Sequence, residues 1–259
     1  MPELPEVEAY RRLAERALHR EIGSVDAPDA WFLKDDLTAD RVAAALPGLR
    51  FTAARRRGKL LLLDTDGDTT LGLRFGMSGR LLVDHTEVID DYAYASMRDE
   101  PAWDRFTITF ADGGDLRMRD PRRLGGVSLD PDEDRLGQDA LVVTRAALRD
   151  LLRSDAPLKA RLLDQARLAG VGNLLADEAL WRSGLDPARP ARSLDDVEVR
   201  RLHRHLRTTI EELSGRGGSH TGDLMPARVR GGVCPRDGAP LLRRTVGGRT
   251  TYSCPKHQR

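Results

Sequence analysis

The only two cysteines of the chain lie in its last 26 residues, and their spacing constrains the fold of that end more than any other feature. Cys234-Pro-Arg-Asp237 and Cys254-Pro-Lys-His257 form two four-residue knuckles, and 16 residues separate Asp237 from Cys254. Thiolate, carboxylate and imidazole groups all bind zinc, and two knuckles on facing hairpin turns bring four ligands to one tetrahedral ion. The spacing predicts one structural Zn²⁺ ion, held by Cys234, Asp237, Cys254 and His257 in a zinc-finger β-hairpin.

Two alternatives to this four-ligand site stay open. The cysteines could pair in a disulfide, although this leaves the matched knuckles unexplained and is uncommon in cytosolic proteins. Asp237 could also stay away from the ion, so that Cys234, Cys254, His257 and a water bind it, or no metal is bound at all.

Length and charge restrict the number of domains, the location and the kind of partner that this protein can have. A chain of 259 residues with 40% hydrophobic and 32% charged residues can form two domains with sizeable cores. It has no apolar run of about 20 residues and no signal-peptide pattern, so we expect a cytoplasmic monomer with no membrane partner.

Residues 200–259 hold 12 Arg and one Lys against four acidic residues, a net charge of +9, while the whole chain carries +1. Such a basic surface indicates a partner with phosphates, although a solvated charged surface has the same composition.

Periodicity divides the chain into a strand-rich part and a helical part. The first part is predicted to contain helices at 3–19 and 38–46, hairpins at 60–64/69–75 and 106–110/116–118, strands at 81–83 and 126–129, and an acidic loop at 84–104. An acidic segment with Pro and Gly at 130–137 indicates a linker. Helices are predicted beyond it at 144–153, 158–165, 174–182 and 195–213. Between the second and third of these, the glycines before Asn173 could let backbone N–H groups approach a phosphate, or could form an ordinary helix–helix turn.

The first residues combine a potential nucleophile with a carboxylate. Removal of Met1 would leave Pro2 with a secondary amine, and an α-amino group has a pKa of about 7.7–8.0, so a useful fraction is neutral near pH 7. Such an amine can attack a sugar C1′ and form an iminium, with Glu3 moving protons beside it. Alternatively, Pro2 and Glu3 simply stabilise the first turn of a helix.

Six short motifs occur in one order along the chain. They are Pro2-Glu-Leu-Pro-Glu-Val-Glu8, Arg57-Gly-Lys59, Gly76-Met-Ser-Gly79, Asp120-Pro-Arg-Arg123, Gly170-Val-Gly-Asn173 with Ala176-Asp-Glu-Ala-Leu180, and Val246-Gly-Gly-Arg249. In this order they resemble bacterial formamidopyrimidine-DNA glycosylase, and the N-terminal motif favours this branch over endonuclease VIII.

The resemblance implies an α+β fold. An N-terminal antiparallel β-sandwich with flanking helices would be followed by a helix-two-turn-helix domain that ends in the zinc-finger hairpin. We expect a catalytic domain at 1–130, a linker at 131–137, the helical domain at 138–220, and a short loop with the zinc hairpin at 221–259.

The resemblance also implies a bifunctional DNA glycosylase and abasic-site lyase of base excision repair, acting on double-stranded DNA with a damaged base or an abasic site. Pro2 would form the Schiff base, Glu3 would transfer protons, and β,δ-elimination would cut the strand. Phosphate and strand contacts would come from Lys59, from Lys159 in the loop before the second helix of the helical domain, and from Asn173 and Arg249. Met77, Arg122 and Leu124 would fill the gap left by the extruded base, and their chemistry suits this role, since apolar side chains wedge between bases and a guanidinium donates to an orphaned base.

Four features depart from the family pattern. Leu124 replaces an aromatic wedge, Arg74 stands where His is common, and two zinc ligands are Asp and His in place of Cys. Only 14 residues separate Ser219 from Cys234, too few for the loop that caps an extruded 8-oxoguanine. The substrate could therefore be a formamidopyrimidine, a hydantoin, an oxidised pyrimidine or another adduct. Two other classes stay open, a non-catalytic lesion- or structure-specific DNA-binding protein and a zinc-ribbon protein that binds RNA.

Overall fold

The computed structural model describes residues 2–89 and 98–259, and its chain forms two compact units. One unit contains Pro2 and continues from Glu6 to Glu133, and the other contains Glu3–Pro5 and Asp134–Arg259. In the described residues no helix is both long and apolar enough to cross a membrane.

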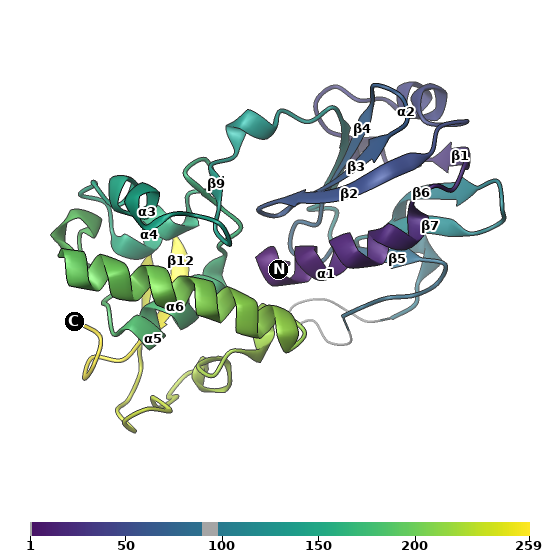
Figure 1. Cartoon of the computed structure of the whole chain (residues 1–259). Coiled ribbons are helices and arrows are strands. Elements are labelled where there is room, and N and C mark those ends of the chain that lie inside the picture. Colours follow the sequence, from purple (N-terminus) through teal and green to yellow (C-terminus); the bar gives the residue numbers. More distant parts are fainter. Residues whose placement is uncertain (1, 90–97) are drawn as a thin grey trace. The chain divides into compact units, whose positions relative to one another are not determined.

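Two four-stranded antiparallel sheets form the first unit (Figure 1). One has the order β2-β3-β4-β8, with strands Phe51–Arg57, Leu60–Thr65, Thr70–Arg74 and Gly126–Leu129. The other has the order β1-β6-β7-β5, with strands Ile22–Asp26, Asp104–Phe110, Asp115–Arg119 and Arg80–Val83. Buried side chains from both sheets belong to one core cluster, so the predicted antiparallel sandwich is confirmed.

The two predicted hairpins form where turn residues interrupt the apolar runs. The β3–β4 turn closes with Thr65 N donating to Thr69 O over 3.2 Å, and Leu61 pairs with Leu73 across it. The β6–β7 turn closes with Phe110 N donating to Gly114 O over 2.8 Å. Each pairing directs alternate side chains of its strands into the sandwich core.

The first helix is shorter than the sequence predicted. The α-helix α1 spans Leu4–Ala14, and a 3₁₀ helix, η1, continues over Glu15–Ala17. The prediction of helix to residue 19 was wrong because Leu18 is extended and forms a bridge with Phe51 of the sheet. Strands β1 and β2 were not predicted, and the prediction of a loop at 84–104 falls partly on residues 90–97, outside the described part.

The helices of the second unit follow the predicted order. They are α3 (Arg145–Leu151), α4 (Leu158–Leu163), α5 (Asn173–Ser183) and α6 (Asp196–Gly215), and α6 lies alongside α5 (Figure 1). Their ends carry the expected signals, with a capping box of Asp195 and Glu198 at α6 and Gly184 in left-handed conformation after α5. A short parallel pair, β9 (Gln138–Asp139) and β10 (Leu168–Ala169), precedes α5.

The chain ends in an antiparallel hairpin, β11 (Leu242–Val246) and β12 (Arg249–Ser253), as the paired knuckles predicted. The remaining helices are α2 (Ala39–Ala45) and the 3₁₀ helices η2 (Ala30–Phe32), η3 (Pro101–Trp103), η4 (Glu133–Arg135), η5 (Ala191–Ser193), η6 (Ser219–Thr221) and η7 (Met225–Ala227).

Candidate functional site

Glu3 is held at the N-terminus of α5. Its side chain is 1% exposed, and its carboxylate accepts hydrogen bonds from the backbone N–H groups of Gly172, Leu174 and Leu175 at 3.0, 2.9 and 3.0 Å. The first N–H groups of a helix have no partner within the helix, and the helix dipole favours an anion there. Glu3 therefore fixes a negative charge directly after Pro2 in the chain.

The glycines before α5 make room for the start of the chain. A Cβ at Gly172 would lie 2.2 Å from Glu3 Cδ, and a Cβ at Gly170, where φ is +110°, would lie 2.6 Å from Leu4 Cδ1. Leu4 N also donates to Gly170 O over 3.1 Å. The Glu3 carboxylate accepts hydrogen bonds from the N–H groups of Gly172, Leu174 and Leu175. These three groups therefore do not point at a phosphate, as the sequence suggested.

Pro2 and Lys59 lie in the first unit. Pro2 is buried, and Lys59 is half-buried in the two-residue turn between β2 and β3, where Gly58 has a φ of +60°. The proposed loss of Met1 concerns a residue outside the described part. The hydrogen bonds of the Glu3 carboxylate are thus described in detail, while the roles of Pro2, Glu3 and Lys59 stay predictions.

The three residues predicted to fill a gap in DNA lie on two turns that are joined by Asp120. Asp120 is fully buried, and its carboxylate accepts from Ser78 Oγ at 2.5 Å and from the N–H groups of Arg122, Leu124 and Gly125 at 3.1, 2.9 and 2.8 Å. Ser78 belongs to the turn that carries Met77. One buried carboxylate therefore sets the turn with Met77 and the turn with Arg122 and Leu124 in fixed positions.

Gly76 lets these two turns approach each other. A Cβ at Gly76, where φ is +55°, would lie 2.3 Å from the carbonyl carbon of Leu124. Met77 is half-buried, whereas Arg122 is exposed and Leu124 is 49% exposed. The structure thus brings the predicted three together and leaves the two on the second turn open to solvent.

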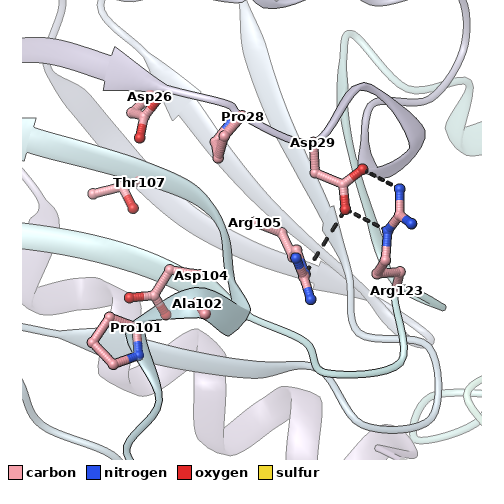
Figure 2. A pocket seen from close by; sticks show the side chains of 9 residues that line it. All are labelled: Asp26, Pro28, Asp29, Pro101, Ala102, Asp104, Arg105, Thr107 and Arg123. Atoms are coloured by element: carbon pink, nitrogen blue, oxygen red, sulfur yellow. Dashed lines mark hydrogen bonds and ion pairs between the residues drawn. The ribbon is translucent and has the colours of Figure 1, made fainter.

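Sequence reasoning missed Asp29, which fixes the second turn from the other side. Arg123 has a φ of +56°, and its Nε and Nη2 both donate to the Asp29 carboxylate over 2.6 Å (Figure 2). The paired guanidinium holds the pKa of Asp29 below its ordinary value. The second Arg of the Asp-Pro-Arg-Arg motif is thus an anchor, and only a contact 94 residues away in sequence reveals this.

The hollow beside this pair has a volume of about 560 Å³ and is lined by Asp26, Asp29, Asp104, Arg105, Thr107 and Arg123 among others (Figure 2). Arg105 Nε lies 3.8 Å from Asp29 and donates to Asp120 O over 3.0 Å. Asp29, Arg105 and Arg123 in this hollow therefore contribute to holding the turn.

Lys159 is placed differently from the prediction. It lies in α4, not in the preceding loop, and it is fully buried. Its ammonium group is 2.6 Å from the buried Asp177 carboxylate and donates to Thr251 Oγ1 over 2.8 Å. Burial lowers the pKa of Lys159 and raises that of Asp177. In this structure the Lys159 ammonium joins α4, α5 and β12, and its predicted contact with a substrate strand stays untested.

Asn173 and Arg249 lie at the starts of α5 and β12, and their predicted phosphate contacts stay untested. Asn173 begins α5, and its Nδ2 donates to Thr250 O over 3.2 Å. Arg249 begins β12 and is exposed beside the Gly247-Gly248 turn. The hydrogen bond from Asn173 to Thr250 therefore links the start of α5 to the strand that carries Arg249.

The four predicted metal ligands converge. One ligand atom from each of Cys234, Asp237, Cys254 and His257 lies within 4.8 Å of the others. His257 Nδ1 is 2.7 Å from Asp237 Oδ2, while Nε2 is 3.3 Å from Trp181 O. The carbonyl fixes the ring so that Nδ1 faces the cluster, which is the usual arrangement for a histidine ligand. Burial raises the pKa of the Cys254 thiol, and the His257 hydrogen bond lowers that of Asp237. The donor set and its convergence fit a divalent metal ion such as zinc.

The short segment before this cluster is fastened to α5. Glu178 accepts from Asp223 N and Leu224 N over 3.1 and 2.9 Å, and Arg228 Nη2 is 3.0 Å from Asp177. Two consecutive acidic residues of one helix thus hold the residues between η6 and η7 and the residue that follows η7. The sequence motif contained both residues but did not reveal this role.

Comparisons with known proteins agree with this architecture. Residues 1–127 match the model of the formamidopyrimidine-DNA glycosylase N-terminal domain, and residues 130–223 match that of its H2TH domain. Proteins named formamidopyrimidine-DNA glycosylase from Heliobacterium modesticaldum and Thermus thermophilus are each 36% identical to the whole chain, over 100% and 98% of their own lengths.

Solved structures of Lactococcus lactis Fpg show the same fold. A complex with DNA containing N7-benzyl-Fapy-dG matches with a TM-score of 0.83 and 26% identity, over the full length of both chains. A complex with DNA containing an abasic site matches with a TM-score of 0.83 and 25% identity, over 99% of both. From its sequence and its fold, the chain belongs to the formamidopyrimidine-DNA glycosylase family of DNA-repair enzymes.

Proposed function

We propose that this DNA glycosylase is bifunctional and uses the Pro2 amine as its nucleophile. The observation that carries this proposal is the Glu3 carboxylate, buried and held by three backbone N–H groups directly after Pro2. A carboxylate fixed in this way can accept and return protons without changing position.

The reaction follows from these two groups. The lone pair of the Pro2 nitrogen attacks C1′ of the damaged nucleotide, and the bond from C1′ to the base breaks, with the base leaving as a protonated neutral species. The Pro2 nitrogen then gives up its proton, and protonation of O4′ opens the sugar ring, which gives an iminium between Pro2 and C1′. Loss of a C2′ proton then expels the 3′ phosphate, and a second elimination expels the 5′ phosphate. Glu3 is the proton acceptor and donor for these steps.

The substrate is proposed to be double-stranded DNA with a damaged base or an abasic site. Lys59, Asn173 and Arg249 bind phosphates, which positions the strand without reading its sequence. Met77, Arg122 and Leu124 occupy the space left by the extruded base, and the turns that carry them are joined by Asp120. Because the segment before Cys234 is short and fastened to α5, we propose a substrate other than 8-oxoguanine, such as a formamidopyrimidine or an oxidised pyrimidine.

The metal site is proposed to be structural. Cys234, Asp237, Cys254 and His257 would hold one Zn²⁺ ion, which would fold the hairpin that carries Arg249 and leave no open coordination position for catalysis. With it we propose a catalytic domain at 1–130, a helical domain at 138–220 and a zinc hairpin at 221–259.

Borohydride trapping tests the nucleophile. The full-length protein with a free Pro2 is incubated with duplexes that carry an abasic site or single oxidised bases, in the presence of borohydride. We expect a covalent protein–DNA adduct that Pro2→Gly reduces strongly and an N-terminal extension abolishes. Trapping that is unaffected by a blocked N-terminus would refute the assignment of Pro2. Tight binding without incision of any lesion would favour the non-catalytic DNA-binding alternative.

A further inference from the structure

Trp31 leaves most of its indole ring in solvent. Its exposed fraction is 69%, and among the described residues of the first unit only Leu124 at 49% and Val88 at 39% are also exposed large hydrophobic side chains. One exposed apolar residue is ordinary on a protein surface. Trp31 is of interest because its segment packs against the turn that carries Leu124.

Residues on both sides of Trp31 are attached to the turn that carries Leu124. Asp29, two residues before Trp31, forms the two-bond pair with Arg123, the residue before Leu124 (Figure 2). Phe32 follows Trp31 and is buried against the residue after Leu124, because a Cβ at Gly125 would lie 3.1 Å from Phe32 Cζ. Trp31 therefore lies on a surface segment packed directly against the turn with Leu124.

Lys34 lies between the indole of Trp31 and the backbone that follows Leu124. Its side chain lies against Gly126, where a Cβ would be 2.5 Å from Lys34 Cε, and its backbone N donates to Val127 O over 2.8 Å. Its ammonium group lies 5.3 Å from the centroid of the Trp31 ring and donates to Trp31 O over 2.5 Å. The ring is thus supported by a cation and a packed backbone while most of its surface stays free.

We propose that Trp31 stacks on a nucleobase of the bound duplex, next to the position that Leu124 enters. This inference rests on the proposed function, which places Leu124 in the DNA. An indole offers a large flat surface that stacks on any base, and such stacking changes affinity by roughly five- to 150-fold per base. Lys34 adds a positive charge beside the ring that suits a neighbouring phosphate. Leu124 has no ring, and Trp31 supplies the aromatic surface on this side of the turn.

Binding and fluorescence of the full-length protein test this proposal. The probe is a duplex that contains a tetrahydrofuran abasic-site analogue, which cannot form a Schiff base. Trp31→Ala should raise its Kd by roughly five- to 150-fold, whereas Trp31→Tyr should restore most of the affinity because it keeps a ring. Binding should quench the tryptophan fluorescence of the wild type, and the quenching should be lost in Trp31→Ala although Trp103 and Trp181 remain.

Val142→Ala is the matched control, since Val142 is 72% exposed and lies in the other unit, and it should bind like the wild type. Unchanged affinity and quenching in Trp31→Ala would overturn the inference, and so would an equal loss in Trp31→Tyr. In either case incision of lesion duplexes by the wild type would leave the proposed function intact. A wild-type protein that neither binds nor incises any lesion duplex would overturn the proposed function and, with it, this inference.

Discussion

Removal of one hydroxyl group should loosen the two turns proposed to enter the DNA. Ser78 is fully buried, and its Oγ donates to the buried Asp120 carboxylate over 2.5 Å, which is the side-chain bond between the turn with Met77 and the turn with Leu124. A hydrogen bond to a charged group contributes about 1.5–3 kcal/mol net. In Ser78→Ala the carboxylate keeps its three N–H donors, so no charge is left unpaired. We therefore expect the free energy of unfolding of the first unit to fall by about 1.5–3 kcal/mol.

Hydrogen exchange in increasing urea measures this loss, because peptides from residues 51–129 report on the first unit alone. Ser128→Ala is the matched control, since Ser128 is also a buried serine of this unit but lies in β8 and on neither turn. A loss in Ser78→Ala below about 0.5 kcal/mol, or equal to that of the control, would refute the reasoning. Incision of one lesion opposite each of the four bases gives the functional readout, and we expect Ser78→Ala to discriminate less between them.

Three further changes test other parts of the structure. Asp237→Ala should lower the zinc content measured by atomic emission and the melting temperature together, and unchanged values would exclude Asp237 as a needed ligand. Asp29 has a lowered pKa beside Arg123, so its contribution to stability is present above the unfolded pKa of about 3.9 and is lost as the pH falls through the folded value. Asp29→Asn should therefore remove part of the stability at pH 6 and flatten its decline below pH 4 in urea titrations, and an unaltered pH profile would contradict this. Lys159→Met should lower the free energy of unfolding by about 3 kcal/mol, because it takes one partner from the buried Asp177, and a variant of normal stability with a raised Kd for DNA would instead show a direct strand contact.

Much of the fold follows from local patterns. The spacing of Cys234 and Cys254 predicts the hairpin and its ligand set, because four ligands can meet at one ion only if the two knuckles face each other. Asp66-Gly67 predicts a turn, since Asp and Gly are both favoured at turn positions, and the apolar period of 195–213 predicts α6. Each of these signals lies within one short stretch of the chain, so it can be recognised from the sequence alone.

The roles of individual charged residues were decided by the tertiary structure. Glu3 meets the start of α5 about 170 residues along the chain, and Arg123 meets Asp29 across 94 residues. No local period records such pairs, so the sequence could show Glu3 only as a candidate catalyst and Arg123 only as a surface charge. Lys159 was predicted to contact the substrate strand from a loop, because the sequence does not record its pairing with the buried Asp177, which explains its burial. The sequence by itself determined which elements form and which side chains can bind a metal. The packing of distant segments decided which charged side chains form buried ion pairs and hydrogen bonds and which stay exposed.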